Sequence, residues 1–464
     1  MIKKVIRCVG FLLVIILTLS FIYSVLSLKD TNGAVQDIYS VHNQLGNTPK
    51  DTIDVLFMGT SHCYNSVYPA VLWQNYGIAS FDFAITSQPK FCTYYYLREI
   101  LKKQSPKVVC IEAYNLAAEG VEEEEEGTIY RNYLGYKSLV DSYNLMKDYG
   151  EDNKGDFLFK WPIVHTRYKE LTRNDFSESN VDRYGCGAEF RMGETGGYFS
   201  AKSHSSEVIP ISDENKEWVD RMYALSEEEG FELLLFLSPF AVFGEEREIM
   251  NGVAEYSASL GIPFLNLIDE ADNMGYDPAI DMMNDFHHCN MNGAAKVSDF
   301  LGTYLSKNYD IPNHAGESSY YHWDMDLEMY LQTLEKNALY EIEDIGEYLS
   351  KVADNPYMTV VLSLDGNFED SVDYLEYFGV SYEEAMSGGK WIYKEGAATR
   401  LMENIPGESM IVDLGRFDSL KLSCNDNPSK YIKFNLTPVT ATENGLNVII
   451  YDTLYETLVD VKGL

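Results

Sequence analysis

Short apolar runs alternate with helical stretches from Ile53 to about Asn308, and this alternation constrains the fold more than any other feature of the chain. The runs that we predict to be strands are 55–58, 80–84, 108–113, 233–237 and 264–268. Strands that alternate with helices build βαβ units, whose helices cover both faces of a parallel sheet. The pattern therefore predicts the α/β class, as a three-layer α/β/α sandwich with a parallel sheet.

The chain has 464 residues, which is too long for one compact core and indicates more than one folded domain. The polar stretch 308–319 indicates a linker, and Leu327, Leu331 and Leu334 then follow at helical spacing. Beyond Pro356 the sequence changes to short β-rich runs with one helix near 372–378; the runs are 358–364, 409–414, 431–436 and 448–451. We predict a membrane anchor at 1–30, an α/β domain at 51–308, a linker with a bridging helix at 309–355, and a smaller C-terminal β-rich module at 356–464.

The first residues have the features of a membrane-spanning segment. Lys3, Lys4 and Arg7 precede an uncharged and mostly apolar stretch, 8–28, of about the 20 residues that cross a bilayer. Basic residues ahead of the span predict a cytoplasmic N-terminus and an extracytoplasmic bulk. A cleaved signal peptide is the alternative, but no small-x-small cleavage pattern stands near 24–27, so the sequence favours an uncleaved, single-pass anchor.

Charge and cysteine content exclude several classes of partner. With 72 Asp and Glu against 36 Lys and Arg, the net charge of −36 argues against a nucleic-acid partner and suits an exported domain. No phosphate-binding loop, His-x-x-x-His or Cys-x-x-Cys pattern occurs, so we predict neither a metal nor another cofactor. The seven cysteines lack disulfide-framework spacing and are expected to be mostly unpaired, with an approach of Cys63 to Cys289 left open. The acidic run 122–126 is expected to be a solvated insertion.

Two short motifs indicate a candidate catalytic site. Gly59-Thr-Ser61-His62 follows the first predicted strand, which places Ser61 in a turn at the edge of the sheet where ligands bind. Asp285-Phe-His-His288 stands just before the last helix of the α/β domain, and its spacing lets the carboxylate reach Nδ1 of His288. A serine hydroxyl needs an imidazole to take its proton and a carboxylate to orient that imidazole. We therefore predict Ser61 as nucleophile, His288 as general base and Asp285 as its orienting group.

These motifs, in this order, resemble the blocks of the SGNH/GDSL hydrolase superfamily over roughly 51–305. The run His288-Cys-Asn290-Met-Asn-Gly293-Ala is most similar to the membrane-anchored bacterial branch that includes the alginate O-acetyltransferases and the protein of lipoteichoic acid D-alanylation. Cys289 stands where that branch commonly has leucine. The resemblance implies a flavodoxin-like sandwich that carries a Ser-His-Asp triad.

The chain departs from the superfamily at the oxyanion hole. The glycine of the second block and the asparagine of the third have no clean counterparts, and the nearest candidates are Ser87, Gln88 and Asn115. Those family residues, with the N–H of the nucleophile, hold the developing negative charge.

Three further polar residues have two interpretations each. His62 either lines the pocket beside the nucleophile or is an exposed or capped histidine, whereas His287 is expected to be a bystander. His165 and Arg167 either hold an anionic group or a sugar hydroxyl of the substrate, or pair with some of the many carboxylates.

The C-terminal module resembles the interleukin-like EMT inducer domain. The similarity lies in Gly445-Leu-Asn447-Val-Ile-Ile-Tyr451-Asp, preceded by the strand-like run 357–365 and followed by Val459-Asp460. The resemblance implies contact with carbohydrate, and the alternative is a structural appendage without a ligand.

Together these features predict a membrane-anchored, extracytoplasmic serine acyl-ester enzyme that acts on a cell-surface or secreted polysaccharide. Transfer of the acyl group to a sugar and transfer to water share one intermediate, so O-acetyltransferase and esterase both remain open. The resemblance to the transferase branch implies a multi-pass membrane protein as acyl donor. The alternative function is a non-catalytic glycan-binding or scaffold protein of the cell envelope that retains the fold.

Overall fold

The computed structural model describes residues 2–26, 38–117, 132, 139–149, 165–169, 171, 186–191, 196–416, 418–424 and 431–464. The chain divides into two compact units, Met1–Glu328 and Met329–Leu464. The acidic run 122–126 lies outside the described residues.

The chain begins with a long apolar helix, α1 (Ile2–Leu26). Its segment Lys4–Leu26 has a mean hydropathy of 2.6 and none of its most apolar window is buried in the protein. By length and composition this helix can cross a membrane, although a signal sequence has the same properties.

The first unit is built on a five-stranded parallel sheet with the order β2-β1-β3-β4-β5. The strands are β1 (Val55–Gly59), β2 (Ser80–Ala84), β3 (Val108–Glu112), β4 (Glu232–Leu237) and β5 (Phe264–Asn266). Four of them are buried along their apolar positions on both faces, as expected when helices cover a parallel sheet. The predicted fold class is confirmed. The chain places β2 on one side of β1 and then crosses to place β3 on the other side. The direction of winding therefore reverses at β1.

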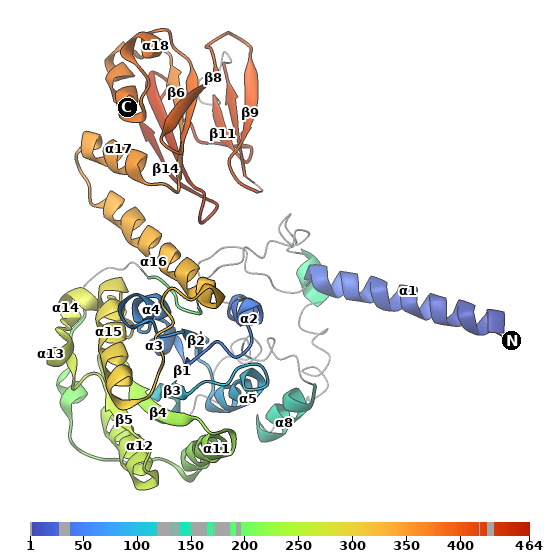
Figure 1. The fold of residues 1–464 in the computed structure, drawn as a ribbon, viewed down its shortest axis with the longest axis vertical. Helices are drawn as coiled ribbons and strands as arrows, with labels where there is room; N and C mark the ends of the chain where they lie inside the picture. The colour runs from blue at the N-terminus through green and yellow to red at the C-terminus, as the bar shows by residue number, and fades with distance from the viewer. Residues whose placement is uncertain are drawn as a thin grey trace. The chain divides into compact units, whose positions relative to one another are not determined.

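Helices cover both faces of this sheet (Figure 1). Among them are α4 (Pro69–Tyr76), α5 (Lys90–Ile100), α11 (Asp213–Glu229), α12 (Glu246–Leu260) and α15 (Met291–Asn308). The other helical segments described between α1 and α16 are α2 (Ile38–Asn47), α3 (Ser61–Tyr64), α6 (Tyr114–Ala117), α8 (Leu139–Tyr149), η2 (His165–Lys169), η4 (Ala201–His204), α13 (Ala271–Met274), α14 (Pro278–Asp281) and η5 (Ser318–Tyr320). The second helix after β1, α4, packs on α15, while α5 packs on α11. This arrangement brings the segment after β1 close to the segment before α15.

The second unit contains two antiparallel sheets, with the orders β14-β13-β6-β7-β8 and β12-β11-β10-β9. Its strands are β6 (Met358–Asp365), β7 (Lys390–Lys394), β8 (Ala397–Met402), β9 (Ser409–Asp413), β10 (Ser419–Ser423), β11 (Ile432–Phe434), β12 (Thr437–Pro438), β13 (Gly445–Asp452) and β14 (Thr457–Gly463). Its helical segments are the end of α16 (Tyr321–Tyr340), α17 (Ile345–Asp354), η6 (Glu369–Phe378) and α18 (Tyr382–Met386). The predicted β-rich module is thus present.

Alternate residues of β6 and β13 enter two separate cores. Val360 and Ile450 pack with α17 and η6, whereas Val361 and Ile449 pack against the four-stranded sheet. This alternation follows from the period of two along a strand. The middle strands of the larger sheet are therefore buried on both faces.

Two local predictions in this module need correction. The helix expected near 372–378 is a 3₁₀ helix, η6. The run expected as one strand, 431–436, is a hairpin instead, because Asn435 and Leu436 adopt left-handed backbone angles with φ of 48° and 75°. Two consecutive left-handed residues form the tight turn that matches the twist of the flanking strands.

The helix expected to bridge the domains is α16, which crosses the boundary between the two units. Its N-terminal part belongs to the first unit, where buried Trp323 donates a hydrogen bond to the carbonyl of Ser80 at 2.7 Å. Asp324 accepts one from the indole of Trp73 at 2.9 Å. The exact domain limits given above stay a prediction.

Candidate active site

The turn after β1 brings Ser61 to the carboxyl edge of the sheet. Gly59 is required here because a Cβ at this position would lie 2.7 Å from the Cβ of Glu112 on the neighbouring strand. Thr60 then caps α3, since its hydroxyl accepts a hydrogen bond from the N–H of His62 at 3.2 Å. Ser61 is the first residue of α3, where a backbone N–H has no acceptor within its own helix.

Ser61, His288 and Asp285 form a continuous chain of hydrogen bonds. Nε2 of His288 lies 2.8 Å from Oγ of Ser61, and Nδ1 of the same ring lies 2.7 Å from Oδ2 of Asp285. The carboxylate selects the tautomer that carries its proton on Nδ1, which leaves Nε2 free to accept the serine proton. The side chain of His288 is 17% exposed and that of Asp285 is 38% exposed, so the site is open to a dissolved substrate.

Hydrogen bonds to backbone groups hold the loop that joins Asp285 to His288. Oδ1 of Asp285 accepts hydrogen bonds from the N–H groups of His287 at 3.0 Å and His288 at 3.1 Å. Phe286 has a φ of 65°, which is strained for a phenylalanine, and its carbonyl accepts a hydrogen bond from Ala241 at 2.9 Å. The loop after β4 therefore stabilises the strained residue between acid and base.

The pKa of Asp285 lies well below its usual range. Partial burial disfavours the carboxylate, but the hydrogen bond from the His288 ring and those from the two backbone N–H groups outweigh that effect. Asp285 is therefore ionised at neutral pH and can stabilise a charged imidazolium on His288.

The residues that follow His288 in the motif have structural roles. The side chain of Asn290 caps α15 by accepting hydrogen bonds from Asn292 and Gly293, and it also donates one to the carbonyl of Ile280 at 2.8 Å. A Cβ on Gly293 would lie 2.2 Å from the carbonyl oxygen of Asp281. Asn290 and Gly293 thus lock the start of α15 against the preceding turn and fix the position of His288.

His62 lies beside the nucleophile and not at the surface. It is 5% exposed, and its ring stacks on Tyr114 at a centroid distance of 4.3 Å. The ring of His288 is 5.3 Å away and that of His287 is 6.2 Å away. Burial, followed by the nearby His288 and His287, lowers the pKa of His62 well below its ordinary value. His62 is therefore neutral and forms part of the wall next to Ser61. In the described part of the chain, the hydroxyl of Ser61 is hydrogen-bonded to the ring of His288, and no hydrogen bond joins it to His287.

The three candidates for the oxyanion hole lie on the loops after β2 and β3, at the same edge of the sheet as Ser61. Gln88 is fully buried and its side-chain amide donates to Thr93 at 2.8 Å, so that donor is used within the start of α5. Asn115 donates one of its two side-chain N–H groups to the carbonyl of Gln88. Ser87 is half-buried with a φ of 47°. No hydrogen bond joins these candidates to Ser61 or His288 within the described part of the chain, and their role stays a prediction.

The remaining candidates, His165 and Arg167, belong to the short helix η2. His165 is exposed, and the side chain of Arg167 lies outside the described residues. Their contact with substrate stays a prediction.

Glu112 is a buried carboxylate behind the nucleophile that the sequence analysis did not single out. Its Oε2 accepts hydrogen bonds from the hydroxyl of Thr60 at 3.4 Å and the N–H of Tyr114 at 3.2 Å. Burial raises the pKa of Glu112 to about 8, although these hydrogen bonds oppose the shift. An acidic residue that ends an apolar strand was the available signal. Glu112 ties the turn that bears Ser61 to the end of β3.

Arg191 is a second residue that the sequence analysis missed. It forms an ion pair with Glu189 at 3.3 Å and lies close enough to Asp285 to interact with its charge. The N–H of Glu189 donates to the carbonyl of Tyr64 in α3 at 3.1 Å, and the N–H of Met291 donates to the carbonyl of Arg191 at 3.0 Å. This segment therefore links the helix that begins with Ser61 to the helix that follows His288.

The thiols and carboxylates near the site are not arranged as a disulfide or a metal centre. All seven cysteines lie in the described part of the chain, and no disulfide joins any two of them. The Cys63 thiol lies 3.4 Å from Asp82 and the Cys289 thiol lies 3.4 Å from Ser66, so these two cysteines have separate partners. Within the described residues, no cluster of three or more His, Cys, Asp or Glu side chains could hold a metal ion.

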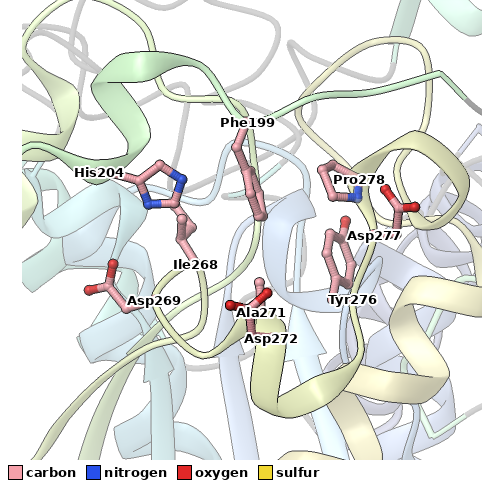
Figure 2. Close-up of a pocket in the computed structure, with 9 residues that line it drawn as sticks. All are labelled: Phe199, His204, Ile268, Asp269, Ala271, Asp272, Tyr276, Asp277 and Pro278. Atoms are coloured by element: carbon pink, nitrogen blue, oxygen red, sulfur yellow. The ribbon is translucent and has the colours of Figure 1, made fainter.

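A cleft of about 580 Å³ opens next to the segment that carries His288 (Figure 2). Its lining residues are Phe199, His204, Ile268, Asp269, Ala271, Asp272, Tyr276, Asp277 and Pro278. The rings of Phe199 and Tyr276 stack with centroids 5.9 Å apart, and the Tyr276 hydroxyl lies 3.5 Å from the thiol of Cys289. Tyr276 therefore connects the lining of this cleft to Cys289, the residue that follows His288.

No protein-family model matches the sequence, and no curated protein matches it significantly. Among solved structures, the chain is similar to a Bacteroides fragilis protein described as an acylhydrolase, with 14% identity and a TM-score of 0.31 over 60% of this chain and 99% of that one. It is also similar to a gut microbial diltiazem-metabolizing enzyme, with 15% identity and a TM-score of 0.28 over 56% of this chain and 47% of that one. A third structure is an acetyl xylan esterase from the rumen bacterium Butyrivibrio proteoclasticus, with 9% identity and a TM-score of 0.24 over 56% of this chain and 65% of that one. At such low similarity, the geometry of the site has to carry the functional assignment.

Proposed function

We propose that this chain is a serine-dependent acyl-ester enzyme in which Ser61 carries the acyl group. The observation that supports the proposal most is the continuous hydrogen-bonded order of Ser61, His288 and Asp285, with distances of 2.8 and 2.7 Å. Such an order is what a hydroxyl needs to become a nucleophile at neutral pH.

The reaction then proceeds through two transfers. Oγ of Ser61 attacks the acyl carbonyl while Nε2 of His288 takes the hydroxyl proton, and ionised Asp285 stabilises the resulting imidazolium. His288 gives that proton to the departing alcohol, which leaves an acyl ester on Ser61. A second hydroxyl, from a sugar or from water, enters with His288 again as base and removes the acyl group.

The oxyanion of each tetrahedral intermediate requires donors close to Ser61. The N–H of Ser61 is the first candidate, because the start of α3 leaves it without an intrahelical acceptor. The second is the N–H of Asn115 that is not committed to Gln88.

We propose further that the acceptor or donor is a glycan of the cell envelope and that the enzyme is an O-acyltransferase or an esterase. The helix α1 supports a location at the membrane, and the basic residues ahead of it support folded units outside the membrane. The acyl donor that we propose is a multi-pass membrane protein, as the resemblance to the transferase branch implies. The cleft beside His288 supports a sugar ligand, since an aromatic ring and carboxylates are the groups that bind sugar faces and hydroxyls.

The test is covalent labelling of the purified full-length chain in detergent with a fluorophosphonate and, separately, with an activated acetyl ester. Peptide mass spectrometry should find the adduct on Ser61, and Ser61→Ala should lose it. Ser259→Ala, which changes an exposed serine of α12, is the matched control and should label like the unmodified chain.

Absence of any adduct on well-folded protein would contradict the proposal and favour the non-catalytic glycan-binding alternative. If the adduct forms, the acetylated enzyme can be offered an oligosaccharide in water. Acetyl on the sugar identifies a transferase, and free acetate alone identifies an esterase.

A further inference from the structure

A buried row of polar groups crosses the larger sheet of the second unit. Lys390 begins β7 and Asn447 lies in β13, and both pair in register with Ser363 of the strand between them, β6. Asp365 stands two residues further along β6, on the same face. Lys390 and Asn447 are 0% exposed and Asp365 is 4% exposed. We call Lys390, Asp365 and Asn447 the buried triplet.

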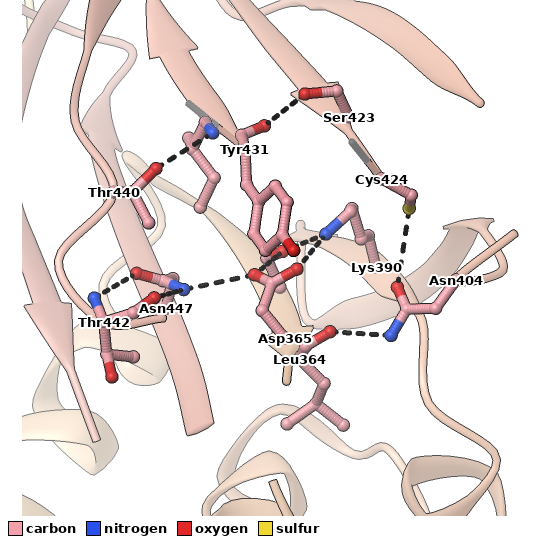
Figure 3. Close-up of polar contacts among 12 residues, drawn as sticks. Leu364, Asp365, Lys390, Asn404, Ser423, Cys424, Tyr431, Thr440, Thr442 and Asn447 are labelled. Atoms are coloured by element: carbon pink, nitrogen blue, oxygen red, sulfur yellow. Dashed lines mark hydrogen bonds and ion pairs between the residues drawn. The ribbon is translucent and has the colours of Figure 1, made fainter. Parts of the chain in front are cut away.

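One carboxylate joins the amine of the buried triplet to its amide (Figure 3). Nζ of Lys390 lies 2.7 Å from Oδ1 of Asp365, and Nδ2 of Asn447 donates to Oδ2 of Asp365 at 3.2 Å. The hydroxyl of Ser363 also donates to Oδ2 at 2.6 Å and accepts a hydrogen bond from Lys390. Asp365 is therefore placed to move protons between the two nitrogens.

The carbonyl of the Asn447 side chain is polarised from the other side. Its Oδ1 accepts hydrogen bonds from the backbone N–H groups of Ala441 and Thr442, each at 2.9 Å. Two backbone donors on one carbonyl oxygen are the arrangement that stabilises negative charge when a nucleophile adds to the carbon. The same contacts hold Nδ2 toward Asp365, since Nδ2 also donates to the carbonyl of Thr442 at 2.9 Å.

The burial of Lys390 has no evident benefit as an ion pair. Lysine is almost never fully buried, and the cost of removing an ammonium and a carboxylate from water can exceed their attraction. For the amine to act as a nucleophile, its proton has to pass to an acceptor, and Oδ1 of Asp365 lies 2.7 Å from Nζ. A neutral amine is a nucleophile.

We propose that Lys390 and Asn447 form an intramolecular isopeptide bond, with Asp365 as the proton-transfer group. Nζ of Lys390 adds to Cγ of Asn447, and the negative charge on Oδ1 is held by the N–H groups of Ala441 and Thr442. Asp365 gives its proton to the Asn447 nitrogen and takes one from Nζ. The bond between Cγ and Nδ2 then breaks, ammonia leaves, and Asp365 remains protonated beside the new amide. No oxidant or cofactor takes part.

The product links β7 to β13 across β6 and is a single-turnover modification of the chain. It replaces a buried ion pair with a neutral amide and closes the chain between residues 390 and 447 into a ring, which restricts the unfolded state as a disulfide does. This modification is independent of the acyl chemistry proposed for Ser61, because it uses residues of the second unit alone.

The test is mass spectrometry of the purified full-length chain, held under native conditions until its mass is constant. The chain should be lighter than its sequence by one ammonia, and a protease digest should contain one branched peptide that joins the segments around Lys390 and Asn447. Asp365→Asn keeps both reacting side chains but removes the proton carrier, so it should retain the full mass and give two separate peptides.

Lys462→Met is the matched control, since Lys462 pairs with Asp460 at the surface of the same module and should leave the branched peptide in place. A folded, unmodified chain that retains its full mass would overturn the proposal. Loss of one water, with the branch on Asp365, would also overturn it, because the electrophile would then be the carboxylate and not Asn447.

Discussion

The two units of this protein each join a carboxylate, a basic nitrogen and a third polar group by hydrogen bonds, but they differ in access to water. In the first unit Asp285 is 38% exposed and His288 is 17% exposed, at the edge of a parallel sheet. In the second unit the buried triplet is enclosed in an antiparallel sheet, with Lys390 at 0% and Asp365 at 4% side-chain exposure. An open group can exchange substrate and product repeatedly, whereas an enclosed group can act only on the chain that contains it.

The difference in exposure to water also predicts which substitutions change activity and which change stability. A charged group that water reaches adds little to folding stability when it is paired, so the open triad can be optimised for chemistry. A charge that is taken out of water becomes strongly destabilising when its partner is removed. We therefore expect substitutions in the open triad to change turnover, and substitutions in the buried triplet to change unfolding.

The largest expected effect is on turnover. His288→Ala should reduce ester hydrolysis by about 10⁴-fold or more, because Ser61 loses its base. His287→Ala, the matched control in the same loop, should change the rate by about tenfold or less, since the serine hydroxyl is hydrogen-bonded to the ring of His288. The measurement is the steady-state rate with an activated acetyl ester. Equal losses in both variants would contradict the assignment of His288.

The next effect is on the unfolding of the second unit. Relative to the chain in which the Lys390–Asn447 bond has not formed, Lys390→Met should lower its unfolding free energy by about 3–5 kcal/mol, because Asp365 is left as an unpaired buried carboxylate. Lys462→Met, at a surface pair, should cost about 1 kcal/mol or less. Denaturant unfolding with a probe in each unit measures both variants. A loss of ester hydrolysis in folded Lys390→Met would break the separation between the two units.

A third prediction concerns Gly293, which supports His288 from the buried start of α15. Gly293→Ala should lower the unfolding free energy of the first unit by about 2–4 kcal/mol, because the new Cβ would meet the carbonyl of Asp281 at 2.2 Å. Gly46→Ala, in a helix where a Cβ meets nothing within 4 Å, is the control and should be neutral or slightly stabilising. Thermal unfolding distinguishes the two. Full stability of Gly293→Ala would show that the start of α15 can shift.

The smallest expected effect is the pH dependence that Glu112 gives to the first unit. Its pKa is about 8 in the folded chain, above the ordinary value of 4.5, so between these values the unfolded chain releases a proton that the folded chain keeps. Stability should therefore fall as pH rises through this window and level off above it. Glu112→Gln should remove part of this fall, about 1–3 kcal/mol between pH 5 and 8. Unfolding at several pH values tests this, and an unchanged slope would mean that Glu112 does not titrate there.

Several elements of the fold were predictable because their signal is local. The five strands of the parallel sheet were found within one or two residues of their observed ends, since a buried strand requires a short continuous apolar run. The hairpin of β11 and β12 was predicted as one strand, because Leu436 stands where the usual Asn-Gly turn has glycine.

The candidate site was predictable in part. Asp285 and His288 are three residues apart, so their contact follows from local chain geometry. The support of that contact was largely not predictable. Glu112 had a weak signal, as an acidic residue at the end of an apolar strand, whereas Arg191 and the strained Phe286 have no sequence pattern that marks them.

The sequence by itself determined the alternation of strands and helices, the long apolar helix at the N-terminus and the identity of the three candidate catalytic residues. Only the tertiary structure decided that His288 meets Ser61 across 227 positions, and that Lys390, Asp365 and Asn447 share one enclosed space. Local sequence patterns indicate the type of a helix or strand and where it ends, because both depend on residues that are neighbours in the chain. Contacts between distant residues depend on how the elements pack, and packing is set by the whole core at once.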